Sequence, residues 1–211
     1  MKFICLKPEL LKLYDSIFTK EKLKAGLSNN DLRIIPLMDQ SLIRQVFINE
    51  YSIWGLPTKE AAEQLTKLFK YNKVYDLGCG TGYLAYLVKQ ANQSLCVTAI
   101  DNFCTGHCML TDKNKWFNII NADAIEVAKE IDYSTVIINW AVYNSDFCYD
   151  LCSVLLSENK SNQVIYIGEE SGGCNANDKF FNSFELEELE VDWFRWFGMC
   201  DHVLEVKSIV K

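Results

Sequence analysis

The segment that most constrains the fold of this chain spans residues 73–88 and reads KVYDLGCGTGYLAYLV. An apolar run typical of a buried strand enters a turn that contains Gly78, Gly80 and Gly82, and a helical pattern begins directly after the turn. Glycine tolerates positive φ angles and lets a ligand approach the backbone closely. A strand, a glycine turn and a helix in this order predict an α/β fold with a cofactor site at the N-terminus of the helix.

The spacing of the glycines narrows the class of cofactor. The pattern is G-x-G-x-G, and the residue after Gly82 is Tyr83, whereas dinucleotide-binding loops read G-x-G-x-x-G. No Gly-Lys-Ser/Thr follows, which excludes a phosphate-binding P-loop. Asp76, two positions before the first glycine, would repel a pyrophosphate but suits a ligand that carries an ammonium and a sulfonium charge. The loop therefore favours S-adenosyl-L-methionine over NAD.

This segment resembles the first motif of the class I S-adenosylmethionine-dependent methyltransferases, D/E-x-G-x-G-x-G, which stands here as Asp-Leu-Gly-Cys-Gly-Thr-Gly. The resemblance implies a Rossmann-like three-layer sandwich whose seven-stranded, mostly parallel sheet has an antiparallel C-terminal strand. It also implies that S-adenosyl-L-methionine is bound by residues of this loop, namely Asp76, Gly78, Cys79, Gly80, Gly82 and Tyr83. The alternative is an ordinary glycine turn of an α/β protein.

Two acidic positions downstream stand in register with the glycine loop. Asp101 and Asn102 close the next strand-like run, 25 residues after Asp76, and an acidic residue about 20 residues beyond such a loop can reach ribose hydroxyls. For Asp123 and Ala124, which follow the third strand-like run, the resemblance implies contacts with the adenine amino group. Asp123 also has the position of a helix N-cap, and the two roles can coexist.

Apolar runs alternate with helical periods after residue 70, which predicts crossover units in a mostly parallel sheet. The expected strands are 73–77, 95–100, 117–121, 135–140 and 163–168, and the expected helices are 82–91, 124–131 and 147–156, with a weak one around 107–115. Residues 191–197 and 202–209 are expected to form two antiparallel strands at the sheet edge. Before the sheet, the spacing predicts helices over 8–24, over 39–50 and after Thr58.

The end of the fourth expected strand, Asn139-Trp140-Ala141-Val142-Tyr143, has the chain position at which this superfamily places substrate-reading residues. Amino-group methyltransferases carry Asp/Asn/Ser-Pro-Pro-Tyr/Phe/Trp there, and this chain keeps the spacing and the aromatic residue without the prolines. We expect Trp140 and Tyr143 to act in catalysis and Asn139 to contact the cofactor, unless Asn139 shifts into the acceptor position. The alternative is a strand end that packs both rings into the core.

Glu169 closes the fifth expected strand, ahead of a loop that contains Ser171, two glycines and Cys174. Because strand ends of an open α/β sheet face the ligand crevice, Glu169 is the carboxylate we expect to orient an amine or to accept a proton. The alternative is a solvated acidic turn.

Tyr51 and Trp54 precede the helix that leads into the first strand, and we expect them to fold over the substrate. The alternative is that they attach the N-terminal extension to the domain. Together with the Trp-x-x-Tyr and Tyr-Ile-Gly-Glu segments, they are similar to a group of uncharacterised methyltransferase-like proteins with a Trp-Pro-Pro-Tyr motif.

Composition restricts the compartment and the partners. Nine cysteines are scattered through apolar segments, which suits reduced thiols in a cytosolic or nuclear protein, and we expect a cytoplasmic one. No apolar run approaches the ~20 residues of a membrane span. A net charge of -7 disfavours nucleic acid as a partner. Cys104, His107 and Cys108 form one compact cluster without a second ligand pair, so no metal site is expected.

The sequence thus predicts a methyltransferase domain over residues 59–211, preceded by a helical extension or lid over residues 1–58. The expected acceptor is a nitrogen or oxygen of a small molecule or a protein. A catalytically silent cofactor-binding subunit is the competing class, because the substrate motif lacks its prolines, and a nucleic-acid methyltransferase is the third. The aromatic run at 193–197 leaves a homodimer or a partner subunit open.

Overall fold

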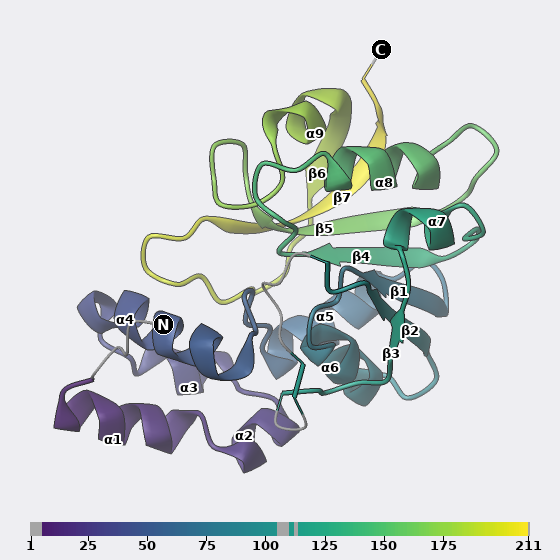
Figure 1. Cartoon of the computed structure of the whole chain (residues 1–211). Helices are drawn as coiled ribbons and strands as arrows, with labels where there is room; N and C mark the ends of the chain where they lie inside the picture. Colours follow the sequence, from purple (N-terminus) through teal and green to yellow (C-terminus); the bar gives the residue numbers. More distant parts are fainter. Residues whose placement is uncertain (1–5, 105–109, 112–113, 211) are drawn as a thin grey trace.

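The computed structural model describes residues 6–104, 110–111 and 114–210 of the chain (Figure 1). Helices occupy the N-terminal quarter, and strands alternate with helices after it. In the described part of the chain the helices are α1 (Pro8–Ile17), α2 (Lys20–Ala25), α3 (Asn29–Arg33), α4 (Leu37–Tyr51), α5 (Lys59–Leu68), α6 (Tyr83–Ala91), α7 (Ala124–Ala128), α8 (Phe147–Leu155) and α9 (Asp178–Ser183). The strands are β1 (Lys73–Leu77), β2 (Cys96–Asp101), β3 (Ile119–Asn121), β4 (Thr135–Asn139), β5 (Gln163–Glu169), β6 (Phe184–Glu188) and β7 (Asp201–Ile209).

The seven strands form one sheet in the order β3-β2-β1-β4-β5-β7-β6. β1 to β5 pair in parallel, whereas β7 pairs antiparallel with both β5 and β6. The chain order reverses between β1 and β4, so the carboxyl ends of these two strands flank a topological switch point, where open α/β sheets bind ligands. The predicted Rossmann-like, mostly parallel sheet with an antiparallel C-terminal strand is confirmed.

Alternating strand residues cover the two faces of the sheet. Val136, Ile138 and Tyr166 belong to a core that α7, α8 and α9 share, and Ile137 and Ile165 belong to a second core with α5 and α6. Figure 1 shows α8 and α9 above the sheet and α5 and α6 below it. Because neighbouring residues of a strand point to opposite faces, the continuous apolar run of β4 serves both cores.

Helices α1 to α4 pack beside α6 and build a third core (Figure 1). Ile43 and Phe47 of α4 are buried there together with Tyr83 and Leu87 of α6 and Trp196 from the loop before β7. The hydroxyl of Tyr83 donates a hydrogen bond of 3.0 Å to the carbonyl of Leu23. The N-terminal helices therefore share buried surface with the first helix after the glycine turn.

The predicted strand over 191–197 is wrong. Residues 191–197 form a loop, because Trp193 packs into the core with α5 while Phe194 and Trp196 pack into the core of the N-terminal helices. The edge strand is β6, which follows the unforeseen helix α9, and β7 lies between β5 and β6. The aromatic side chains of this run are therefore divided between two buried cores and do not form one face of a strand.

The other boundaries differ by a few residues. The single helix expected over 8–24 is divided into α1 and α2, because the Thr19 side chain caps a new helix by accepting from the N–H of Lys22. Part of the weak helix expected around 107–115 lies outside the described residues.

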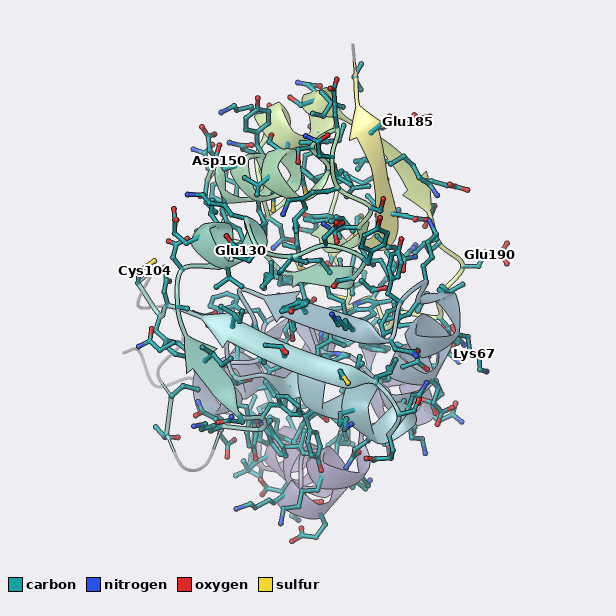
Figure 2. The ribbon with its side chains drawn as sticks, turned by 90° about the vertical axis from the view of Figure 1, so that its right-hand side faces the viewer. Lys67, Cys104, Glu130, Asp150, Glu185 and Glu190 are labelled. Carbon is teal, nitrogen blue, oxygen red and sulfur yellow. The ribbon has the colours of Figure 1, made fainter. Side chains whose placement is uncertain are left out.

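Among the described helices, none is long and apolar enough to cross a membrane. Exposed carboxylates are spread over the molecule, as the labelled Asp150, Glu185 and Glu190 show (Figure 2).

The core shared by the N-terminal helices and α6 predicts that they unfold together. Phe47 is 1% exposed and contacts the ring of Phe18 at 4.7 Å, so Phe47→Ala should lower the free energy of unfolding by about 3–5 kcal/mol. Urea unfolding followed by circular dichroism should remain one transition. Ile34→Ala, at a side chain that is 60% exposed, should change the free energy by less than about 0.5 kcal/mol. Two separated transitions would contradict the shared core.

Candidate functional site

The glycine turn after β1 is held by the end of β2. Gly78, Gly80 and Gly82 have φ angles of 75°, 55° and 73°, which residues with a side chain rarely adopt. The N–H groups of Gly78 and Cys79 donate to the carbonyl of Ile100 at 2.9 and 3.1 Å, and the N–H of Gly80 donates to Oδ2 of Asp101 at 2.8 Å. These donors are therefore used inside the protein and do not form an anion-binding loop.

Asp76 places a buried carboxylate behind this turn. The residue is 1% exposed, and neither carboxylate oxygen has a hydrogen-bond partner. The pKa of Asp76 is raised to about 7, mainly by burial; the nearby N–H of Ala85 opposes the rise without reaching hydrogen-bond geometry, and the charge of Asp101 contributes to it. A buried carboxylate without a partner is costly, and it favours a cation placed nearby.

A cavity of about 240 Å³ opens at the carboxyl ends of β1, β2 and β4. The glycine turn and Asp101 form one wall, the segment after α4 forms a second, and the segment after β4 forms a third. Its lining comprises Ser52, Ile53, Trp54, Gly55, Gly78, Cys79, Gly80, Thr81, Tyr83, Leu84, Asp101, Asn139, Trp140, Ala141, Val142, Tyr143, Cys174 and Asn175. Among these described lining residues there is no lysine, arginine or histidine, so the cavity offers nothing cationic to a phosphate chain.

Two tryptophans build the wall opposite the glycine turn. The rings of Trp54 and Trp140 have centroids 6.4 Å apart and planes 24° apart. Gly55 makes this approach possible, because a Cβ at this position would lie 2.3 Å from Cδ1 of Trp140. Oδ1 of Asn139 is buried beside them and has no hydrogen-bond partner. The wall thus combines apolar ring surface with one unused hydrogen-bond acceptor.

Charged side chains support Trp140 from outside the cavity lining. Its Nε1–H donates to Oδ1 of Asp201 at 3.0 Å, and the guanidinium of Arg44 lies 4.5 Å from the ring centroid. Burial raises the pKa of Asp201 to about 6, while the hydrogen bond from Trp140 and the charge of Arg44 lower it. Trp140 has a φ of 52°, a strained value for a residue with a side chain. The indole N–H is donated to Asp201, so Trp140 offers ring surface to the cavity and no free polar group.

Most residues predicted for the site lie around the cavity. The lining includes nine of them, from the glycine turn, the end of β2, the end of β4 and the segment after α4: Gly78, Cys79, Gly80, Tyr83, Asp101, Asn139, Trp140, Tyr143 and Trp54. Tyr83 is largely buried, and its hydroxyl donates to the carbonyl of Leu23. Tyr143 is 66% exposed at the mouth. Their roles stay predictions.

Other predicted residues do not line the cavity. Tyr51 donates from its hydroxyl to the carbonyl of Phe18 at 3.2 Å and packs on Phe47, so these contacts lie within the N-terminal helical segment. Asp123 caps α7 by accepting from the N–H groups of Ile125 and Glu126. Further predicted residues outside the lining are Asp76, Gly82, Asn102 and Ala124.

Glu169 has a different environment from the one expected. It is 6% exposed, and its carboxylate accepts from the N–H of Cys174 at 2.6 Å and from the N–H of Cys200 at 3.2 Å. Both oxygens are therefore used to hold two loops together, and neither lines the cavity. The alternative of a solvated acidic turn is wrong, because the carboxylate of Glu169 is buried.

Sequence reasoning missed Arg44, Asp201 and Asn175. Asn175 accepts from the N–H of Glu169 and donates to the carbonyl of Ala141 at 3.4 Å, which ties the loop after β5 to the end of β4. All three reach the site from elements distant in sequence, and no local motif marks them. Within the described residues no group of three or more His, Cys, Asp or Glu side chains could hold a metal ion, and the cluster at 104–108 lies largely outside them.

Residues 58–145 match the family described as Methyltransferase small domain. No curated protein matches the chain. The sheet order agrees with the fold implied by the sequence motif, so the chain has a Rossmann-like fold.

Solved structures with a similar fold are remote in sequence. A mutant of MtNAS in complex with S-adenosylmethionine is 12% identical, covers 95% of this chain and 71% of that chain, and has a TM-score of 0.49. Human N-acetylserotonin methyltransferase in complex with SAM is 11% identical, with coverages of 86% and 57% and a TM-score of 0.43. Mitomycin 7-O-methyltransferase MmcR is 13% identical, with coverages of 95% and 66% and a TM-score of 0.46.

The raised pKa of Asp76 predicts a stability effect of unusual sign. A carboxyl group whose folded pKa exceeds its unfolded pKa stabilises the protein at low pH, and this contribution is lost as the pH rises to about 7. Asp76→Asn should therefore raise the free energy of unfolding at pH 8 by about 2 kcal/mol or more, and by less at pH 4. Urea unfolding at both pH values measures the difference.

Asp101→Asn is the matched control, because the carboxylate of Asp101 accepts from the N–H groups of Gly80 and Phe103. The same change there should destabilise the protein at pH 8. A destabilising Asp76→Asn would show that the buried carboxylate has partners that stabilise it.

Proposed function

We propose that this chain, which has a Rossmann-like methyltransferase fold, is an S-adenosyl-L-methionine-dependent methyltransferase that transfers a methyl group to a nitrogen of a small molecule or a protein side chain. One observation carries the proposal: an unpartnered, buried carboxylate, Asp76, stands behind a turn of three positive-φ glycines at the rim of a cavity. S-adenosyl-L-methionine would supply an electrophilic methyl group on a sulfonium centre.

The described residues fit this cofactor. Asp76 offers negative charge without a competing partner, which favours the ammonium and sulfonium groups of the ligand. Asp101 lines the cavity and is the candidate for the ribose hydroxyls. The loop donors at Gly78, Cys79 and Gly80 are already used, so the turn fits a cationic ligand better than a pyrophosphate.

The substrate wall favours nitrogen over oxygen as the methyl acceptor. An amine nitrogen already has the lone pair that attacks a methyl group, whereas a hydroxyl oxygen needs a base. Glu169, the expected base, does not line the cavity, and both of its carboxylate oxygens accept from backbone N–H groups. Oδ1 of Asn139 is buried and unpartnered, and it can accept from an amine N–H. Trp54 and Tyr143 supply ring surface against which a planar acceptor can pack.

The protein's contribution to the reaction would be orientation and exclusion of water. Asn139 and the aromatic wall fix the acceptor, and the glycine turn fixes the donor, so the two reacting atoms are held in line. The apolar rings keep water away from the transferred methyl group.

A cofactor-binding subunit without catalysis is the second candidate. The strained φ of Trp140 and the use of its indole N–H by Asp201 support this candidate, because they are consistent with a structural role for Trp140 at the position where the resemblance implies a proline motif. Such a subunit would bind the cofactor and support the activity of a partner.

Calorimetric titration with S-adenosyl-L-methionine tests the cofactor site. Wild-type protein should bind, and the affinity should rise between pH 6 and pH 8, because deprotonation of Asp76, with its pKa of about 7, creates the charge that attracts the ligand. Asp76→Asn should weaken binding at pH 8 by about tenfold or more and remove this pH dependence. Gly80→Val should abolish binding, because valine resists a φ of 55°. Folded wild-type protein that does not bind would overturn the proposal.

Labelled methyl transfer into fractionated cell extracts tests the acceptor. Asn139→Ala should lower transfer by about 100-fold and leave cofactor affinity within about twofold, because a lost acceptor at the reacting group affects the transition state. Glu126→Gln serves as the control: transfer should change by less than about threefold, because the Glu126 side chain is 66% exposed beside Lys129 and lies outside the cavity lining. Binding without transfer into any fraction favours the silent subunit. A loss of cofactor affinity in Asn139→Ala would assign Asn139 to the cofactor.

A further inference from the structure

We propose that Arg44 is a positioning residue that reaches from α4 to fix Trp54 and Trp140, the two aromatic walls of the cavity, and so sets where the methyl acceptor lies. The inference rests on the proposed function for its catalytic consequence, but the positioning itself can be measured without turnover. Arg44 does not line the cavity, so it acts through the two rings.

The contacts of Arg44 join two parts of the chain. Its Nη2 donates to the carbonyl of Trp54 at 3.3 Å, and its guanidinium carbon lies 4.5 Å from the centroid of the Trp140 ring. Trp54 belongs to the segment after α4, and Trp140 follows β4. One side chain therefore ties the N-terminal helices to the end of a central strand at the substrate wall.

The backbone of both walls is strained. Ser52 and Trp140 have φ angles of 53° and 52°, and residues with a side chain keep such angles only where the surroundings impose them. Trp140 is held by Asp201 at its indole N–H and by Arg44 at its ring face. Gly55 has no side chain and therefore leaves room for the Trp140 ring without holding it. Arg44 is thus the contact that acts on both strained segments.

The charges around Arg44 explain why a cation is tolerated there. Burial lowers the pKa of Arg44, and the charges of Asp201 and Glu169 oppose this effect. These two carboxylates come from β7 and from β5. Glu169 and Asp201 are neighbours across the antiparallel β5 and β7 pair, so two carboxylates balance one guanidinium. The guanidinium keeps its charge, because arginine is not deprotonated in proteins.

The geometry requires arginine and not lysine. A planar guanidinium can stack on an aromatic face and donate hydrogen bonds in its own plane, whereas an ammonium is a compact charge on a flexible stem. Arg44→Lys therefore keeps the charge that Asp201 and Glu169 need but loses the simultaneous contacts to Trp54 and Trp140. This separates positioning from charge compensation.

Fluorine NMR of protein labelled with 5-fluorotryptophan tests the positioning. The chain has five tryptophans, each assigned by substitution with phenylalanine. In Arg44→Lys, the resonances of Trp54 and Trp140 should shift or broaden, while those of Trp116, Trp193 and Trp196 stay in place. Arg33→Lys, in the same helical layer and paired with the exposed Asp192, is the matched control and should leave Trp54 and Trp140 unchanged. Five unshifted resonances, or shifts at all five, would overturn the proposal.

Methyl transfer supplies the second readout. Arg44→Lys should raise the half-saturating concentration of the acceptor fraction by about tenfold and leave the affinity for S-adenosyl-L-methionine within about twofold. Equal losses in both would show a structural role only and would overturn the proposal. If wild-type protein transfers no methyl group to any fraction, the proposed function fails, and the fluorine spectra still decide whether Arg44 positions the two rings.

Discussion

The end of β2 holds the glycine turn, and the geometry of the site depends on this junction. One carbonyl, that of Ile100, accepts from two consecutive N–H groups of the turn, and the carboxylate of Asp101 accepts from the N–H of the next residue, Gly80. Parallel pairing sets β1 and β2 in register, with Leu77 opposite Ile100, so the turn after β1 meets the end of β2 directly. Since these donors are used internally, a ligand meets a fixed shape and a negative field and not a row of free N–H groups.

The buried carboxylate of Asp76 lowers the free energy of unfolding, and this cost points to a role in function. A core position with no hydrogen-bond partner would be filled at lower cost by an apolar residue or an amide. Proteins keep such costly groups mainly at functional sites, where stability and activity compete. The stability of this fold is distributed over three buried cores, so it can tolerate one unfavourable group.

The sequence predicted correctly those features that depend on residues close together in the chain. The positive φ angles of the three glycines, the N-cap at Asp123 and the bounds of β1 and β5 follow from short-range sterics and periodicity. The wrong predictions concern features that depend on contacts between segments distant in the sequence. Residues 191–197 alternate like a strand but divide their aromatic rings between two cores, and the use of Glu169 depends on N–H groups from two other loops. Arg44 and Asp201 meet Trp140 from opposite ends of the chain, which no local motif reveals.

The substrate wall links the two halves of the chain. In a Rossmann-like sheet the cofactor side depends on β1, β2 and the glycine turn, which one supersecondary unit supplies. The proposed acceptor side has no such unit, and the cavity wall assigned to it is assembled from the segment after α4, the strained end of β4 and the loop after β5. Arg44 of α4 contacts the first two of these segments, Asn175 ties the third to the end of β4, and the N-terminal helices share a core with α6, the helix that follows the glycine turn. If the proposed function holds, a movement of the N-terminal helices would therefore change both sides of the cavity together.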